Sequence, residues 1–287
     1  MANLKEIRNR ISSVGSTMQI TSAMKMVSAA KLKRAQDAIT QMRPYANKLR
    51  ELLVNLSSTL EGSDGGAYSE TREAKKVLLV AITSNRGLCG AFNSNVLKKA
   101  KSLAGGEYAN STVSFLTIGK KATAFFNKEG YSVLSSHDGL YDNLTFENTA
   151  VIAESMMTQF IAGDFDKVVL VYNQFKNAAS QNLMAEQFLP VETPADDTAT
   201  IGDYIFEPSK EEIVTDLIPK SLKIQLFKAV LDSHASEHGA RMTAMHKATD
   251  NAGELRKDLK LTYNKARQAA ITGEILEIVG GAEALNG

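Results

Sequence analysis

The sequence has no tryptophan, a single cysteine and only five prolines in 287 residues. One cysteine, Cys89, excludes an internal disulfide and a zinc site built from several thiolates of one chain. Such cysteine usage is typical of a protein from a reducing compartment. Scarce proline and few aromatic side chains favour helices. These absences describe a helix-rich chain that needs no covalent crosslinks.

Long hydrophobic runs are also missing. No apolar stretch reaches the ~18–20 residues that a membrane-spanning helix needs. Residues 1–10 alternate charged side chains with Leu4 and Ile7, unlike a secretory signal. We therefore expect any membrane contact to come through a partner. A hydrophobic fraction of 44% and a charged fraction of 23% are those of a globular protein with one or two domains.

Positive charge is concentrated near the N-terminus. Residues 1–50 contain ten Lys and Arg against Glu6 and Asp37, a net charge of +8, whereas the whole chain carries +1. Two interpretations stay open. The first is a solvated helix face, and the second is an electrostatic surface for an acidic protein, nucleic acid or anionic lipid.

Both ends of the chain show apolar residues at alternating steps of three and four, the pattern of a helix with a narrow seam. We expect helices over residues 3–60 and 209–280. The second would be roughly 110 Å long and needs a partner, so we predict that the two helices pair as an antiparallel coiled coil. The predicted seam positions are Leu4, Ile7, Ile11, Val14, Met18, Ile39, Met42, Ala46, Leu49, Leu53, Leu56 and Leu60, and Met245, Ala248, Ala252, Leu255, Leu259, Thr262, Ala266, Ala269, Gly273, Leu276 and Gly280.

Two segments are more apolar than a helix pair requires. Ala23–Ala30 is apolar or small on nearly every side of the helix, and Ile271–Leu285 has only three charged residues, all Glu. A helix that is apolar all round should be enclosed. We therefore expect another partner around the first segment and an apolar sleeve around the second.

Between the two helical ends, strands alternate with helices, which indicates βαβ units and a mostly parallel sheet. The predicted fold is α/β, with a Rossmann-like domain at residues 75–200 inserted into a coiled coil of residues 1–60 and 209–287. The expected strands are 77–83, 112–118, 131–135, 167–173 and 182–191, and the expected helices are 91–103, 120–128 and 146–162.

Three features resemble chemical sites. Ser84–Gly90 (SNRGLCG) follows a buried strand, where α/β proteins bind ligands, but it lacks the spacing of a phosphate-binding loop and fits a tight turn better. His234 and His238 match H-x-x-E-H, a zinc-peptidase spacing, without a third ligand or a cleft. Cys89 has no histidine partner in the sequence pattern. We assign no catalytic residue, metal or cofactor.

Four segments resemble the gamma subunit of F-type ATP synthase. They are KEIRNRISSVGSTMQITSAMKMVSAAKLKRAQ, SNRGLCGAFN, ASEHGARMTAMHKATDNA and YNKARQAAITGEILEIVGGA, in that order along the whole chain. Ser84 and Asn85 stand where the family commonly has Thr-Asp. The resemblance implies a non-catalytic rotor subunit of a bacterial enzyme, on the cytoplasmic face of the inner membrane. It would couple proton flow through the c-ring to ATP synthesis or hydrolysis at the beta subunits.

The same resemblance implies partners and contact residues. The partners are the alpha, beta and epsilon subunits and the c-ring, with no nucleic acid. Arg267 and Gln268 match the pair that meets a beta-subunit catch loop, and Met24 and Lys25 match the shaft face near beta. Tyr204 and Glu207 match the foot on the c-ring. The apolar bearing tip would comprise Ile271, Ile275, Leu276, Ile278 and Val279.

Two other functions remain open from the residues alone. The charge of residues 1–50 suits a nucleic-acid-binding module with a helical arm, whose affinity would fall steeply with salt. The α/β segment suits a nucleotide-binding enzyme.

Overall fold

The computed structural model describes residues 4–57, 68–191 and 210–286. The chain divides into two compact units, Met1–Ser28 together with Met242–Gly287, and Ala29–Arg241. The predicted boundaries assign residues 29–57 and 210–241 differently and stay a prediction. Among the described residues, no helix combines the length and apolar character needed to cross a bilayer.

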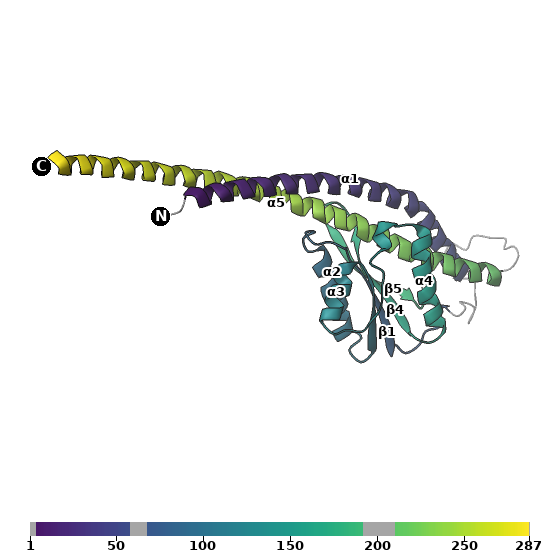
Figure 1. Ribbon diagram of the computed structural model, residues 1–287. Coiled ribbons are helices and arrows are strands. Elements are labelled where there is room, and N and C mark those ends of the chain that lie inside the picture. The colour runs from purple at the N-terminus through teal and green to yellow at the C-terminus, as the bar shows by residue number, and fades with distance from the viewer. Residues whose placement is uncertain (1–3, 58–67, 192–209, 287) are drawn as a thin grey trace. The chain divides into compact units, whose positions relative to one another are not determined.

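The first unit is a pair of antiparallel helices, contributed by the start of α1 (Leu4–Ser57) and the end of α5 (Lys210–Asn286) (Figure 1). The hydroxyls of Thr21 and Thr249 lie 2.8 Å apart. Nearer the N-terminus, Arg8 Nη2 donates to Tyr263 Oη at 2.8 Å. Low numbers on α1 meet high numbers on α5, so the predicted antiparallel pairing is confirmed for this unit.

The seam of this pair agrees with the prediction on α1 and only partly on α5. Leu4, Ile7, Ile11, Val14 and Met18 are all buried or half-buried. On α5 the predicted Leu255, Thr262 and Ala269 are exposed, and the residues that follow each of them are half-buried: Arg256, Tyr263 and Ala270.

The error on α5 has a physical cause. Arg and Tyr carry a long apolar stem or ring behind a polar tip, so they can cover a seam although a count of apolar residues passes over them. On the opposite helix, Gly15 has no side chain and leaves room for Arg256. A Cβ added at Gly15 would lie 4.0 Å from Arg256 Nε. Leu276 and Gly280 are exposed as well.

The second unit is built on a five-stranded sheet in the order β3-β2-β1-β4-β5. Strands β1 to β4 are parallel, and β5 pairs antiparallel with β4, so the predicted mostly parallel sheet is confirmed. The strands are β1 (Lys76–Ile82), β2 (Thr112–Ile118), β3 (Val133–Ser136), β4 (Lys167–Phe175) and β5 (Gln181–Leu189).

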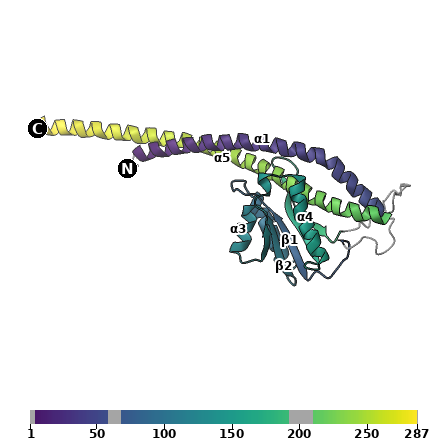
Figure 2. The same cartoon turned by 45° about the vertical axis from the view of Figure 1, so that its right-hand side comes forward.

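Helices cover both faces of this sheet (Figure 2). Because successive strand residues point to opposite faces, β1 sends Leu79 into the core under α2 (Phe92–Gly105) and α3 (Lys120–Lys128). Leu78 enters the core formed with α4 (Phe146–Ile161) and the early part of α5. The strand is buried on both faces, as its continuous apolar run predicts.

Several helix expectations can be compared directly. The α1 positions Ile39 and Leu49 are buried, and Met42 and Ala46 are half-buried; Leu53 and Leu56 have no described side chain and Leu60 lies outside the described residues. Pro44 and Pro219 lie inside α1 and α5. Neither proline ends its helix.

Gly119 gives the first testable prediction, because it joins β2 to α3 at φ +101° and a Cβ there would lie 2.2 Å from Thr83 O. We expect Gly119→Ala to lower the free energy of unfolding by ~3 kcal/mol or more, measured by urea denaturation. Gly130→Ala is the matched control, since Gly130 also has positive φ (+78°) but open space around it; its cost should be about 1 kcal/mol. Equal costs would contradict the steric explanation.

Candidate functional site

The loop Ser84–Gly90 joins β1 to α2 and is held by the side chain of Asn93 in the first turn of α2. Asn93 Oδ1 accepts from Ser84 N at 2.9 Å, and Asn93 Nδ2 donates to Ser84 Oγ at 2.9 Å and to Cys89 Sγ at 3.2 Å. Leu88 has a left-handed backbone (φ +63°) and is exposed. The loop is a tight strand-to-helix turn, as its spacing indicates.

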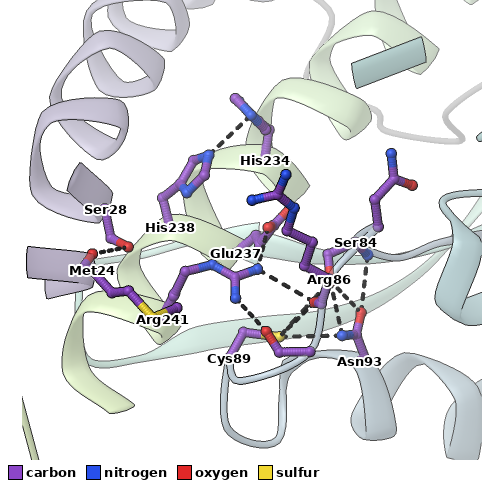
Figure 3. Close-up of polar contacts among 12 residues, drawn as sticks. Met24, Ser28, Ser84, Arg86, Cys89, Asn93, His234, Glu237, His238 and Arg241 are labelled. Carbon is purple, nitrogen blue, oxygen red and sulfur yellow. Dashed lines mark hydrogen bonds and ion pairs between the residues drawn. The ribbon is translucent and has the colours of Figure 1, made fainter. Parts of the chain in front are cut away.

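A buried arginine fastens this loop to α5 (Figure 3). Arg241 Nη1 donates to Gly87 O, and Nη2 donates to Arg86 O at 3.3 Å. The same guanidinium pairs with Glu237 Oε1 at 2.5 Å, and both side chains of the pair are buried. Two loop carbonyls are thereby occupied, and this arrangement positions the turn rather than a ligand.

The lone thiol lies inside this arrangement. Cys89 is 1% exposed, and burial raises the pKa of its thiol, opposed by smaller effects of Ser84 and Arg241. A thiol of raised pKa carries little thiolate at neutral pH, and thiolate is the reactive form. The geometry therefore describes a structural cysteine.

The H-x-x-E-H match forms a close pair of imidazoles. His234 Nε2 and His238 Nε2 lie 3.1 Å apart (Figure 3). Glu237, the acid of the motif, is engaged by Arg241. Within the described ranges, no three His, Cys, Asp or Glu side chains converge as a metal site requires.

The last turns of α5 carry an exposed apolar surface. At equal rise along the two helices, Leu4 lies level with Arg267, so residues 268–286 extend beyond the described start of α1. Arg267 and Gln268 are exposed at this level. The predicted tip residues beyond it are 48–72% exposed: Ile271, Ile275, Leu276, Ile278 and Val279.

A second exposed apolar surface lies on α1. Ile20, Met26 and Val27 are 58–65% exposed, although they belong to a helix that is paired along its other side. Met24 and Lys25 are half-buried, and Lys25 Nζ lies 3.5 Å from His246 Nδ1. Of the predicted contact residues, Tyr204 and Glu207 lie outside the described residues.

Comparison with known proteins agrees with these features. The sequence profile of the family described as ATP synthase matches residues 3–285. ATP synthase gamma chains of Flavobacterium johnsoniae and Flavobacterium psychrophilum are 68% and 66% identical, over 100% of both chains in each comparison. This chain belongs to the ATP synthase gamma chain family.

Solved structures with a similar fold include chains of mitochondrial ATP synthases. A chain from the Tetrahymena thermophila mitochondrial ATP synthase central stalk and c-ring is 29% identical, with a TM-score of 0.61 over 80% of this chain and 99% of that chain. A chain from the Euglena gracilis mitochondrial ATP synthase in rotational state 3 is 24% identical, with a TM-score of 0.71 over 98% and 94%. The second likeness shows the fold alone.

The Arg241 anchor is the feature of this region that the sequence pattern does not predict. The spacing of Glu237 and Arg241, four residues apart on a helix, signals an ion pair. It does not signal burial, nor a contact with carbonyls 154 and 155 residues earlier in the sequence.

The second prediction tests this anchor. Arg241→Met leaves Glu237 buried without its cation, so we expect a loss of ~3–5 kcal/mol in the free energy of unfolding. The double change Glu237→Gln with Arg241→Met should recover part of that loss, because the uncompensated charge is gone. Urea denaturation of the full chain measures both.

Lys33→Met is the matched control for the Arg241 test. Lys33 and Asp37 form an ion pair at the same helical spacing, 2.8 Å apart and exposed. Its loss should cost ~0.3–0.5 kcal/mol. Similar costs for Lys33→Met and Arg241→Met would show that burial does not set the strength of the anchor.

Proposed function

We propose that this chain is the central-stalk rotor subunit of an F-type ATP synthase. It couples proton flow through the membrane c-ring to ATP synthesis or hydrolysis at the beta subunits by rotating. The full-length identity of 68% to a gamma chain carries the proposal. The apolar end of α5 beyond Leu4 supports it, because such a surface is stable in water only when a partner covers it.

The chain itself is non-catalytic in this proposal, and ATP chemistry belongs to the beta subunits. The features that resembled chemical sites support this assignment. The turn after β1 has two of its carbonyls bound by Arg241, and the only thiol is buried. Coupling by rotation requires a stiff element with an uneven surface, and it requires no reactive group.

The apolar tip is the part that would turn inside the alpha and beta subunits. An apolar lining forms few directional hydrogen bonds, so rotation there breaks few bonds at once. Three glutamates, Glu274, Glu277 and Glu283, are the charged residues of this segment. We assign Ile271, Ile275, Leu276, Ile278 and Val279 to the bearing surface.

Other contacts follow from the matched family motifs. Arg267 and Gln268 would meet the beta catch loop, which their exposure permits. The face near the beta subunits would include Met24 and Lys25, and the outward Met26 and Val27 widen it. Tyr204 and Glu207 would contact the c-ring beside epsilon. The complex would hold the chain at the cytoplasmic face of the bacterial inner membrane.

The third prediction concerns the tip. Deleting residues 271–287, or changing Ile275 and Ile278 to Asp, should weaken coupling or assembly, because a charged or missing tip leaves the apolar sleeve unfilled. Proton-driven ATP synthesis and ATP-driven proton pumping by the reconstituted complex measure the effect. Changing Glu274 and Glu277 to Gln is the control and should alter both rates little. Unchanged ATP synthesis after the deletion would contradict the proposal that the tip turns inside an apolar sleeve.

A further inference from the structure

The imidazoles of His234 and His238 have no role in the proposed rotor, and their geometry points to a different property. Their Nε2 atoms lie 3.1 Å apart, with the rings at 79° to each other. A hydrogen bond between two ring nitrogens needs one donor and one bare acceptor. The pair therefore cannot hold this geometry with both rings protonated.

The surroundings of His238 favour this ring as the donor. His238 is 5% exposed, and its Nδ1 has no hydrogen-bond partner among the described residues. An unpaired buried N–H is rarer than an unpaired buried acceptor, so the proton of neutral His238 belongs on Nε2, which donates to His234. Protonating His238 would place an N–H at Nδ1, where the described part of the chain offers no acceptor.

His234 connects this pair to another part of the sheet domain. The ring of Tyr141 stacks on His234, with centroids 5.6 Å apart and planes at 19°. Tyr141 belongs to a single 3-10 turn, η2 (Leu140–Asp142), between β3 and α4. The stack thus joins that turn to α5 in the part of the helix that belongs to the same compact unit.

The charged groups around the pair oppose its protonation. The positive charge of Lys31 in α1 repels a proton on either imidazole, and the charge of Arg241 in α5 repels a proton on His238. Burial, with Lys31, lowers the pKa of His234 to about 4. Burial, with His234, Lys31 and Arg241, lowers the pKa of His238 to about 3. Glu237, the neighbouring acid, is paired with Arg241, and burial raises its own pKa.

We propose that His234, His238 and Tyr141 form an acid-sensitive latch that holds the turn Leu140–Asp142 against α5 while both imidazoles are neutral, and that releases the turn when they take up protons. The latch is a regulatory property of the fold and does not depend on the proposed rotor function. Acidification would release this turn from α5, and return to neutral pH would restore the contact.

The direction of the pH effect follows from proton binding. An opened or unfolded state exposes both imidazoles, whose ordinary pKa is 6.5. Below that pH the imidazoles bind protons in the open state and stay neutral in the closed state. The closed state therefore loses stability relative to the open state as pH falls. Each histidine favours the open state by up to about tenfold per pH unit, until the pH reaches its lowered pKa.

The fourth prediction compares the full chain with His238→Gln and with the double change of His234 and His238 to Gln. Urea denaturation from pH 8 to pH 5 measures the equilibrium constant of unfolding for each protein. Below pH 6.5 this constant should rise more steeply with falling pH for the unchanged chain than for the variants, by up to about tenfold per pH unit for each histidine replaced. The slope against pH is the result, so a variant that is less stable at every pH remains informative.

His246→Gln is the matched control, because His246 lies on the same helix and is exposed; it should keep the slope of the unchanged chain. Hydrogen exchange at pH 5.5, corrected for intrinsic rates, should show residues 137–145 losing protection before the rest of the sheet domain, and only when both histidines are present. An equal slope in the double variant would overturn the latch, as would uniform loss of protection across the domain.

Discussion

The pairing of α1 with α5 is the constraint on which the rest of this structure depends. The backbone hydrogen bonds of a helix as long as α5 (Lys210–Asn286) do not stabilise it in water on their own. Most of its stability must come from packing against other elements. Residues 242–267 of α5 are stabilised by α1 along a seam that uses Thr21, Thr249, Arg256 and Tyr263 as well as aliphatic residues. A seam of this composition holds two helices in register without enclosing either of them.

In the proposed rotor, the unenclosed surface is what contacts the partner subunits. Ile20, Met26 and Val27 on α1 and the tip of α5 are exposed together with the polar sides of the same helices. A broader seam would bury Ile20, Met26 and Val27 and leave no apolar residue on this part of α1 for an outside subunit to contact. The mixed seam and the exposed apolar residues are therefore two consequences of one sequence pattern, and both suit an element that is surrounded by other subunits.

Sequence reasoning predicted most of the fold, and its errors are local. The elements Thr112–Ile118 and Lys120–Lys128 have the predicted bounds. Apolar periodicity marks each element, and Gly119 separates the end of the strand from the start of the helix. The third strand starts at Val133 rather than 131, since the ring of Tyr131 packs against Phe115 and Phe126 before the strand begins. Leu255 was assigned to the seam because it is apolar, whereas the stem of Arg256 covers that position.

The contacts that organise the sheet domain were beyond prediction for a different reason. Arg241 reaches carbonyls of Arg86 and Gly87, and His234 meets Tyr141, across sequence separations that no local pattern records. Both contacts involve the same few turns of α5. Arg241 there forms a buried ion pair with Glu237, and His234 forms a pair with His238. Buried polar groups of this kind stabilise one arrangement strongly only while every proton is in place. In the proposed latch, the part of α5 that packs against the sheet is therefore also the part whose contacts with the turn Leu140–Asp142 weaken on acidification.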